Sequence, residues 1–567
     1  MMTFLLTLAC NGFAEDTGET ATTDTGPVEV LATEHCGKLT EDETWSAGLH
    51  TVSCDVQVNG GTLTIEPGAV VEFKQGKGLL VAQDQQAATL VVNGAELGPD
   101  STTEGVSWSG VSFSAYGEGS LRDTTLAMAG AGLKGAIVIN GTSVLLAGVS
   151  IDGSKTDGIH LRNGGTLAAD SSALAVTGAE GYPVVVDAVS AHTLVPGEYT
   201  GNGVDRVFMR GDDVTGDVVW VDLGVPWLVD GAVRFLGTAD APAGLTVGAG
   251  VEFNMNNASS MVFGPDGGAA SVTLEGTVDA PVRLSGYGSD EPGYWKGLVF
   301  RPATTSAFLR YVVIEDTGKG ADAAVVIDDT EVLLDRVSIL DSSEPGLGLE
   351  GTGSLAEGSG AIVISNCEFG GFMPPEAVSR LPSDTVLSDL GEDIIAVRGG
   401  TDVQSSGTWS DLGVAYRIDV VVKVDGTADE PADLVLAPGV ELLFRNDKGL
   451  YFSQLLGASS LTAVGTEAEP IVLRGYDSAE PGSWYGLGVF DNALFAELDH
   501  VVIDGAGGNK LDGNLHVEES AVTLGTVTLS NSGQWGAYFN VPAADLPSLE
   551  GVTFDGNAKG PWTHVDL

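Results

Sequence analysis

The densest group of chemically capable side chains in the sequence lies in the stretch DGSKTDGIHLRNGG, which contains Asp152, Lys155, Asp157, His160 and Arg162. They supply acids, a base and cations within one short stretch, the groups that general acid–base catalysis requires. A later stretch in the same place of the repeat described below, NSGQWGAYFN, carries none of them. We therefore expect no catalytic residue here, and catalysis by Lys155, Asp157, His160 and Arg162 is the alternative.

Two acidic turns offer oxygen ligands for a metal ion. The turn GYGSDEPG contains Asp290 and Glu291, and the turn GYDSAEPG contains Asp477 and Glu480. Carboxylate oxygens are ligands that Ca²⁺ prefers, but the tandem calcium-binding repeat G-G-x-G-x-D is missing. The histidines show no zinc-type spacing either. We expect ordinary solvated turns and no cofactor, with Ca²⁺ as the alternative.

Three tryptophans recur at equivalent places, in WSGVSF from Trp108, WKGLVF from Trp295 and WYGLGVF from Trp484. Indole rings stack well on sugars, and Tyr294 and Tyr485 flank two of the three. A Trp that leads directly into a Gly-apolar strand in every copy is more typical of a buried corner residue. We favour the structural interpretation over a carbohydrate platform.

The charge balance excludes several classes of partner. The sequence has 78 Asp and Glu against 25 Lys and Arg, a formal net charge of −53. Nucleic acids and anionic membranes bind clustered basic residues, so we expect this chain to bind neither of them directly. We interpret the acidity as a means of solubility, with diffuse Ca²⁺ binding along the acidic surface as the alternative.

Cys36 and Cys54 lie 18 residues apart, at the entry to the folded part of the chain. In an exported protein they are expected to form a disulfide that closes a short loop, and two free thiols are the alternative. Cys367 lies in the apolar run AIVISNCEF, where we expect a small buried core residue.

The N-terminus reads MMTFLLTLAC and passes directly into a tract rich in Thr, Asp, Glu and Gly. A short apolar run that ends in Ala-Cys resembles a bacterial lipoprotein signal, and the resemblance implies that Cys10 carries the lipid. An ordinary secretory signal is the alternative. Residues 11–35 have too little apolar surface to fold, so we expect a flexible acidic linker. No later run approaches 18 apolar residues, which leaves the lipid as the expected membrane attachment.

An internal repeat organises the rest of the chain. The phrase LTIEPGAVVEF starts at Leu63, and its counterparts LTVGAGVEF and LVLAPGVELLF start at Leu245 and Leu434. The second and third copies keep an offset of 189 residues, which the motifs WVDLG at Trp220 and WSDLG at Trp409 repeat. The first copy differs by small insertions or deletions. A long repeat of this kind indicates a solenoid or an array.

Each copy consists of short apolar runs separated by Gly, Asn, Asp or Ser, as in AAVVIDDTEVLLDRVSIL. Alternating apolar residues predict strands with one buried face. No convincing amphipathic helix interrupts them, which disfavours α/β folds, and no propeller-blade marker recurs. The remaining fold is a solenoid in which each turn supplies hydrogen-bond partners to the next.

The chain resembles the right-handed parallel β-helix proteins of the pectate-lyase-like superfamily, and more narrowly exported bacterial repeat proteins with the phrase L-T-I-x-P-G-V-x-x-x-F … G-T … P-I … W-x-G-L. The resemblance implies an all-β, right-handed parallel β-helix solenoid built from three homologous segments. It says little about function, because the same scaffold serves lyases, glycosidases, adhesins and stalks. The expected parts are a signal (1–10), a linker (11–35), and three β-helix segments (36–219 with an N-terminal cap, 220–408 and 409–567).

We expect an exported monomer, held at the outer membrane or cell surface by its lipid, or otherwise secreted. The expected function is non-catalytic, namely adhesion, recognition or structural extension, with an extracellular glycan or a surface protein as partner. The alternative is an extracellular polysaccharide lyase or glycoside hydrolase. Such an enzyme needs carboxylates, or carboxylates with Arg or Lys, that converge in a groove.

Overall fold

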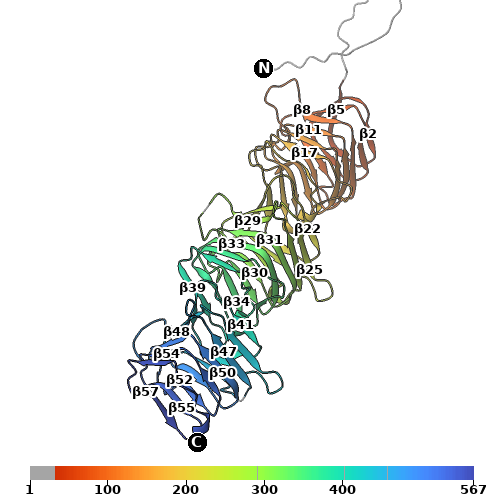
Figure 1. The fold of residues 1–567 in the computed structure, drawn as a ribbon. Coiled ribbons are helices and arrows are strands. Elements are labelled where there is room, and N and C mark those ends of the chain that lie inside the picture. The colour runs from red at the N-terminus through yellow and green to blue at the C-terminus, as the bar shows by residue number, and fades with distance from the viewer. Residues whose placement is uncertain (1–31, 290, 401, 456, 567) are drawn as a thin grey trace, which may run out of the picture.

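The computed structural model describes residues 32–566 except 290, 401 and 456. This part of the chain is an elongated rod of stacked turns, with β2 and β5 near one end and β57 at the other (Figure 1). The paired strands run parallel, in sheets of up to 25 strands. No helix among the described residues is long and apolar enough to cross a membrane. The predicted all-β parallel β-helix is confirmed.

One turn of the solenoid contains three strands, so the rod has three faces. The first turn made of three separate strands runs through β4 (Thr62–Ile65), β5 (Ala69–Phe73) and β6 (Gly78–Val81). The next strand, β7 (Ala88–Asn93), returns to the first face and pairs in parallel with β4. Alternate residues of β7 are buried, as the sequence pattern predicts.

The first face begins next to the N-terminal end. It contains, in chain order, β2 (Glu43–Trp45), β4, β7, β10 (Gly117–Arg122), β13 (Ser143–Ala147), β16 (Thr166–Leu167), the 3₁₀-helix η1 (Ala188–Thr193), β21 (Asp213–Val214), β24 (Ala232–Phe235), β27 (Ser260–Phe263), β30 (Gly297–Phe300), β32 (Val325–Asp328), β34 (Leu347–Glu350), β37 (Phe369–Met373), β39 (Glu392–Val397), β42 (Ala415–Ile418), β45 (Glu441–Phe444), β48 (Ile471–Gly475), β51 (Val501–Asp504), β54 (Val527–Ser530) and β56 (Val552–Asp555). A short 3₁₀-helix, η2 (Pro265–Gly267), follows β27.

The second face follows the first in each turn. It contains β1 (Thr33–Leu39), β3 (Gly48–Val58), β5, β8 (Glu96–Pro99), β11 (Thr125–Ala127), β14 (Ser150–Asp152), β17 (Leu174–Thr177), β19 (Gly197–Glu198), β22 (Val218–Trp220), β25 (Ala243–Val247), β28 (Ala270–Glu275), β31 (Thr304–Glu315), β33 (Glu331–Ser342), β35 (Ser354–Leu355), the helix α1 (Pro375–Val378), β40 (Asp402–Val403), β43 (Val422–Val424), β46 (Gly449–Phe452), β49 (Gly486–Val489), β52 (Gly513–Glu518), β55 (Trp535–Asn540) and β57 (Gly560–Val565). The long strands β1, β3, β31 and β33 continue onto the third face.

The third face completes the turn. It contains β6, β9 (Gly110–Phe113), β12 (Gly135–Asn140), β15 (Asp157–Arg162), β18 (Val184–Asp187), β20 (Val207–Arg210), β23 (Trp227–Asp230), β26 (Glu252–Met255), β29 (Val282–Gly286), β36 (Val363–Cys367), β38 (Val386–Ser388), β41 (Gly407–Trp409), β44 (Ala432–Leu436), β47 (Ser459–Val464), β50 (Ala493–Asp499), β53 (Val522–Leu524) and the 3₁₀-helix η3 (Ala543–Asp545).

Each segment is rotated by one face relative to the segment before it. The repeat phrase begins on the first face in β4, on the second face in β25 and on the third face in β44. The chain makes seven turns from β4 to β24 and then reaches β25 on the next face; seven turns likewise lead from β25 to β43, and β44 follows. Equivalent residues of the three segments therefore point in three directions around the rod.

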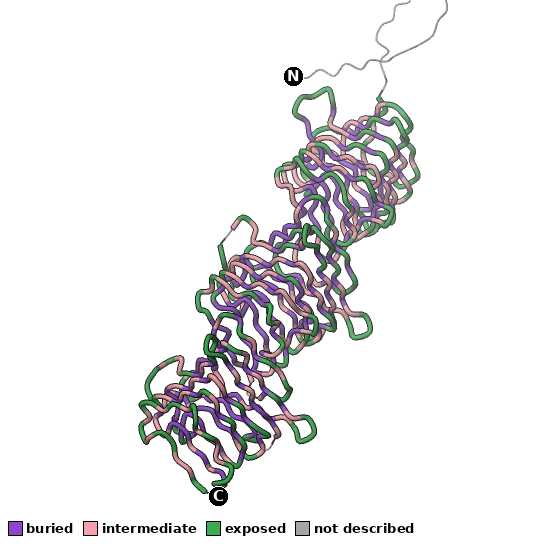
Figure 2. Tube along the Cα trace, viewed as in Figure 1, coloured by how far each residue is buried: buried purple, intermediate pink, exposed green. Residues whose placement is uncertain are grey.

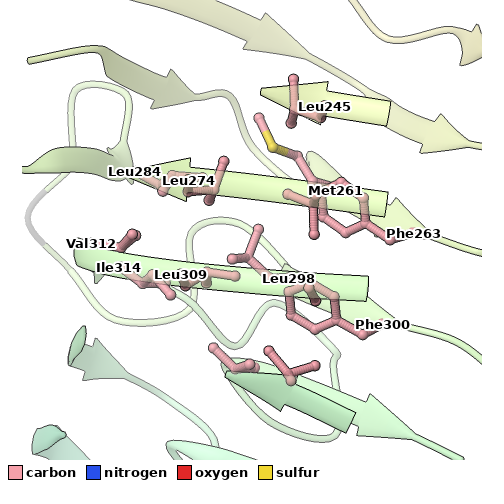
Figure 3. Packing of buried hydrophobic residues seen from close by; sticks show 14 of the residues in the cluster. Leu245, Met261, Phe263, Leu274, Leu284, Leu298, Phe300, Leu309, Val312 and Ile314 are labelled. Atoms are coloured by element: carbon pink, nitrogen blue, oxygen red, sulfur yellow. The ribbon is translucent and has the colours of Figure 1, made fainter. Parts of the chain in front are cut away.

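A single core runs through the described rod. One cluster of buried apolar side chains extends from Trp45 to Val541, and the purple interior of the tube continues through all three segments (Figure 2). Equivalent side chains stack from turn to turn: the ring centroids of Phe263 and Phe300 lie 5.2 Å apart in successive strands (Figure 3). Because no turn can bury its apolar face alone, this shared core joins the segments into one body.

The N-terminal end differs slightly from the expected boundary. Strand β1 begins at Thr33, so the folded body starts three residues before residue 36, where it was expected to begin. The Cys36–Cys54 disulfide is present, with its Cα atoms 4.9 Å apart, and it joins β1 to β3. The expected signal, with Cys10, and linker residues 11–31 lie outside the described residues. Cys367 is buried in the core as predicted, and burial raises the pKa of its thiol to about 11.

Candidate functional site

The sequence cluster around His160 is only partly assembled in the structure. Strand β15 places Asp157 and His160 together, with Asp157 Oδ2 3.4 Å from His160 Nδ1. Lys155 instead pairs with Glu180 of the following turn, at 3.0 Å. Arg162 is exposed at the end of the strand, and within the described ranges no hydrogen bond or ion pair joins it to His160. Asp152 is also exposed, at the end of β14.

The imidazole of His160 is hydrogen-bonded to a residue that the sequence cluster does not contain. Arg210, two turns further along the third face, places Nη2 3.2 Å from His160 Nε2 and binds Asp187 through Nε at 2.8 Å. A guanidinium group only donates hydrogen bonds, so the Nε2 lone pair accepts one. Asp157 is occupied as well, because its Oδ1 accepts the N–H of Tyr182 at 3.1 Å. This arrangement binds successive turns together, with both the imidazole and the carboxylate engaged in contacts within the rod.

The described carboxylates of the two acidic turns are not gathered into a cluster. Glu291, Asp477 and Glu480 are exposed, and Asp290 lies outside the described residues. Asp477 accepts the N–H of Asn446 at 3.0 Å, which makes it a turn-stabilising residue. Across residues 32–566 without the three gaps, no group of three His, Cys, Asp or Glu side chains could hold a metal ion.

The repeated tryptophans are corner residues of the core. Trp108, Trp295 and Trp484 have no exposed surface. Their indole N–H groups donate to the backbone oxygens of residues 127, 315 and 504, at 2.7, 2.6 and 2.9 Å. The ring of Trp484 stacks on Phe444 with centroids 4.2 Å apart. A buried, hydrogen-bonded ring has no face available to a sugar, so the structural interpretation holds.

Glycine is required two residues after each of these tryptophans for a steric reason. Gly297 has φ +103°, and a Cβ there would lie 2.1 Å from the backbone oxygen of Ala324 in the next turn. Gly110 has the same φ and an equally close neighbour, Ala136. The W-x-G phrase is therefore explained by packing between turns.

One outer surface gathers acidic and basic groups. Glu350 ends β34 on the first face, and burial, followed by the nearby carboxylates of Asp322 and Asp328, raises the pKa of its carboxyl. Arg301 lies 2.9 Å from Asp328 and 4.0 Å from Glu350. Burial also raises the pKa of Glu344, with Glu368 and Asp322 contributing. We refer to Arg301, Asp322, Asp328 and Glu350 as the Glu350 group.

Three of the four short helices in the described residues interrupt the three faces, one face each. Each replaces a strand: η1 follows β16 on the first face, α1 follows β35 on the second, and η3 follows β53 on the third. The strand before each helix is the last in a series of paired strands. Its edge toward the next turn therefore lies beside a helix instead of another strand. Exposed edges of this kind are places where a protein can bind an extended chain.

The first of these edges is closed by the chain itself. In the first segment, Thr193 Oγ1 accepts the N–H of Leu167 at 3.2 Å and donates to the backbone oxygen of Ser190 at 2.8 Å. The second edge leaves a cavity of about 340 Å³ lined by residues of β35 and α1. Glu376, which lines this cavity, accepts the N–H of Gln404 at 2.7 Å.

The third edge leaves a cavity of about 670 Å³ between β53 and η3, which we name the β53 hollow. It is lined by Glu519, Ser520, Ala521, Val522, Val541, Pro542, Ala544, Asp545, Leu546 and Pro547. No motif in the sequence analysis pointed to it. The signal that could have found it is the pair Pro542 and Pro547, since prolines lack the N–H that a sheet requires. Comparisons with protein-family models, with curated proteins and with solved structures give no match.

Proposed function

We propose that this chain is an exported, non-catalytic rod that is tethered at its N-terminal end and holds a recognition surface away from the cell. The observation that carries the proposal is the uninterrupted core from Trp45 to Val541. A rod with one core is rigid, so its far end stays at a fixed distance from its anchor. Separately folded domains joined by linkers do not keep such a distance.

Three further observations support the proposal. The disulfide between Cys36 and Cys54 fits an oxidising compartment, since disulfides persist outside the cytosol. The net charge of −53 keeps the rods apart from one another and from anionic surfaces. The β53 hollow belongs to the segment furthest from the N-terminal end (Figure 1), which suits a rod that presents a binding surface.

The experiment is to express the full chain in a bacterium with an epitope attached after Leu567. We expect an antibody to label the epitope on intact cells, and the Cys10→Ser variant to release the protein into the medium. A Thr7→Ser variant is the matched control, because it alters the same short segment and leaves the cysteine in place. Labelling that requires broken cells would contradict surface display.

A polysaccharide-cleaving enzyme is the second candidate, and the Glu350 group is the observation that favours it. A carboxyl with a raised pKa beside a second carboxylate and an arginine is the set from which such enzymes build an acid and a base. Product release from a panel of plant, algal and microbial polysaccharides, abolished by Glu350→Gln and retained by Glu357→Gln, would support it. Release no higher than that of heat-denatured protein would reject it.

A further inference from the structure

Strand β53 has an unpaired hydrogen-bonding edge. Among the described residues it pairs only with β50, on one side. The N–H of Ala496 donates to Ala521, and the N–H of Gly525 donates to Leu498, so alternate residues of this segment face β50. In a strand the residues between them point their N–H and C=O groups the opposite way, so those of Val522, which lines the β53 hollow, and of Leu524, further along the strand, lie on the edge away from β50.

The part of the chain that the structure describes does not pair with this edge. The next turn passes over β53 as residues 541–547, which include η3, and no hydrogen bond within the described part of the chain joins them to β53. Pro542 and Pro547 have no N–H to donate. This stretch, VPAADLP, also lacks a hydroxyl side chain that could close the edge in the way that Thr193 closes the first one.

The residues that line the β53 hollow determine which class of ligand it can bind. Val522 and Val541 are buried and Leu546 is half-buried, which gives apolar contacts to alternate side chains of an extended chain. The exposed carboxylates of Glu519 and Asp545 line the opening, and neither makes an ion pair in the part of the chain that the structure describes. Together with the net charge of −53, they favour a basic ligand.

We propose that the β53 hollow binds an extended, basic peptide segment of a partner protein, which adds to the edge of β53 as a further strand. Its main chain pairs with Val522 and Leu524, its alternate apolar side chains contact Val541 and Leu546, and its Lys or Arg residues lie beside Glu519 and Asp545. This mode of binding takes its affinity from main-chain hydrogen bonds and its specificity from the side-chain contacts.

The test uses the purified full chain with Cys10→Ser and a library of fluorescent octapeptides. Each peptide carries Lys at both ends and Val, Ile, Leu or Thr between them. We expect members of the library to bind, and methylation of alternate backbone nitrogens of the best member to weaken binding at least tenfold. Hydrogen exchange should show that the amides of Val522 and Leu524 gain protection when this peptide is bound.

Matched variants separate a specific site from general attraction to an acidic rod. Ala521→Trp places a large ring in the hollow and should weaken binding at least tenfold, and Ala544→Trp should do the same from the opposite wall. Ala239→Trp, at an exposed alanine outside the hollow, should change affinity less than twofold. Asp545→Lys should weaken binding at least threefold, with the loss diminishing at high salt.

Three results would overturn the proposal: no library member binds, Ala521→Trp binds as tightly as Ala239→Trp, or the amides of Val522 and Leu524 gain no protection. This inference rests on the proposed function, because it names the class of partner that the proposed recognition surface binds. The two fail separately, since surface display is read from the epitope on intact cells and peptide binding from the purified chain.

Discussion

His35 Nε2 lies 2.9 Å from His50 Nδ1 in the first turns of the rod. The other nitrogen of His35 is 3.1 Å from Glu43 Oε1, and that of His50 is 2.7 Å from the backbone oxygen of Ser46. With both imidazoles neutral, His35 donates to His50 and His50 donates to Ser46, while Glu43 Oε1 accepts the indole N–H of Trp45 at 2.6 Å. This chain of hydrogen bonds at the N-terminal end of the rod is therefore complete when His35 is neutral.

We expect the N-terminal end to loosen in mild acid. Burial lowers the pKa of His35, with His50 lowering it further and Glu43 opposing. A histidine whose pKa is lowered by folding contributes its full stability above its ordinary pKa of about 6.5, and that stability falls as the pH drops below this value. Hydrogen exchange of β1 at pH 7.5 and pH 5, corrected for intrinsic rates, checks this. In a His35→Gln variant, the exchange of β1 should no longer differ between the two pH values. Slower exchange of β1 at pH 5 than at pH 7.5 in the unsubstituted chain would contradict this role of His35.

Removing the disulfide should destabilise the same end of the rod and spare the far end. For a closed loop of 18 residues, the Cys36→Ala/Cys54→Ala variant is expected to lose about 3 kcal/mol from the opening of β1 and β3. Hydrogen exchange reports each turn separately. Reduction of the unsubstituted chain should reproduce the effect, and equal loosening of β48 would show that the rod does not open locally.

Substitution of a corner tryptophan should lower the free energy of unfolding far more than substitution of an exposed tryptophan. Trp295→Ala removes a fully buried ring and its hydrogen bond to residue 315, and should destabilise the protein by about 3–5 kcal/mol. Trp562 is 38% exposed, and Trp562→Ala should cost no more than about 1 kcal/mol. Urea unfolding followed by tryptophan fluorescence measures both. Similar losses would mean that Trp295 is not a core residue.

Much of the fold could be predicted because its causes are local and repeated. The 189-residue offset and the alternation of apolar residues indicate stacked strands, and the position of Trp before Gly in every copy indicates a buried corner. The disulfide could be predicted because Cys36 and Cys54 are close in the sequence and stand at the start of the folded region.

The candidate sites could not be predicted in the same way, because their contacts join different turns. His160 meets Arg210, 50 residues away, only because the loops between them have particular lengths. Lys155 reaches Glu180 for the same reason. Each segment is rotated by one face because seven turns and one further strand separate equivalent strands, and the sequence does not mark where each turn closes.

The distance between two spin labels on the first face tests most directly that the three segments form one rigid rod. Glu118→Cys in β10 and Val472→Cys in β48 are separated by fourteen turns, counted along the first face through η1. At about 4.8 Å per turn we expect a narrow distance distribution centred near about 67 Å. A broad distribution, or one centred tens of ångströms away, would show independently moving segments and contradict the continuous solenoid.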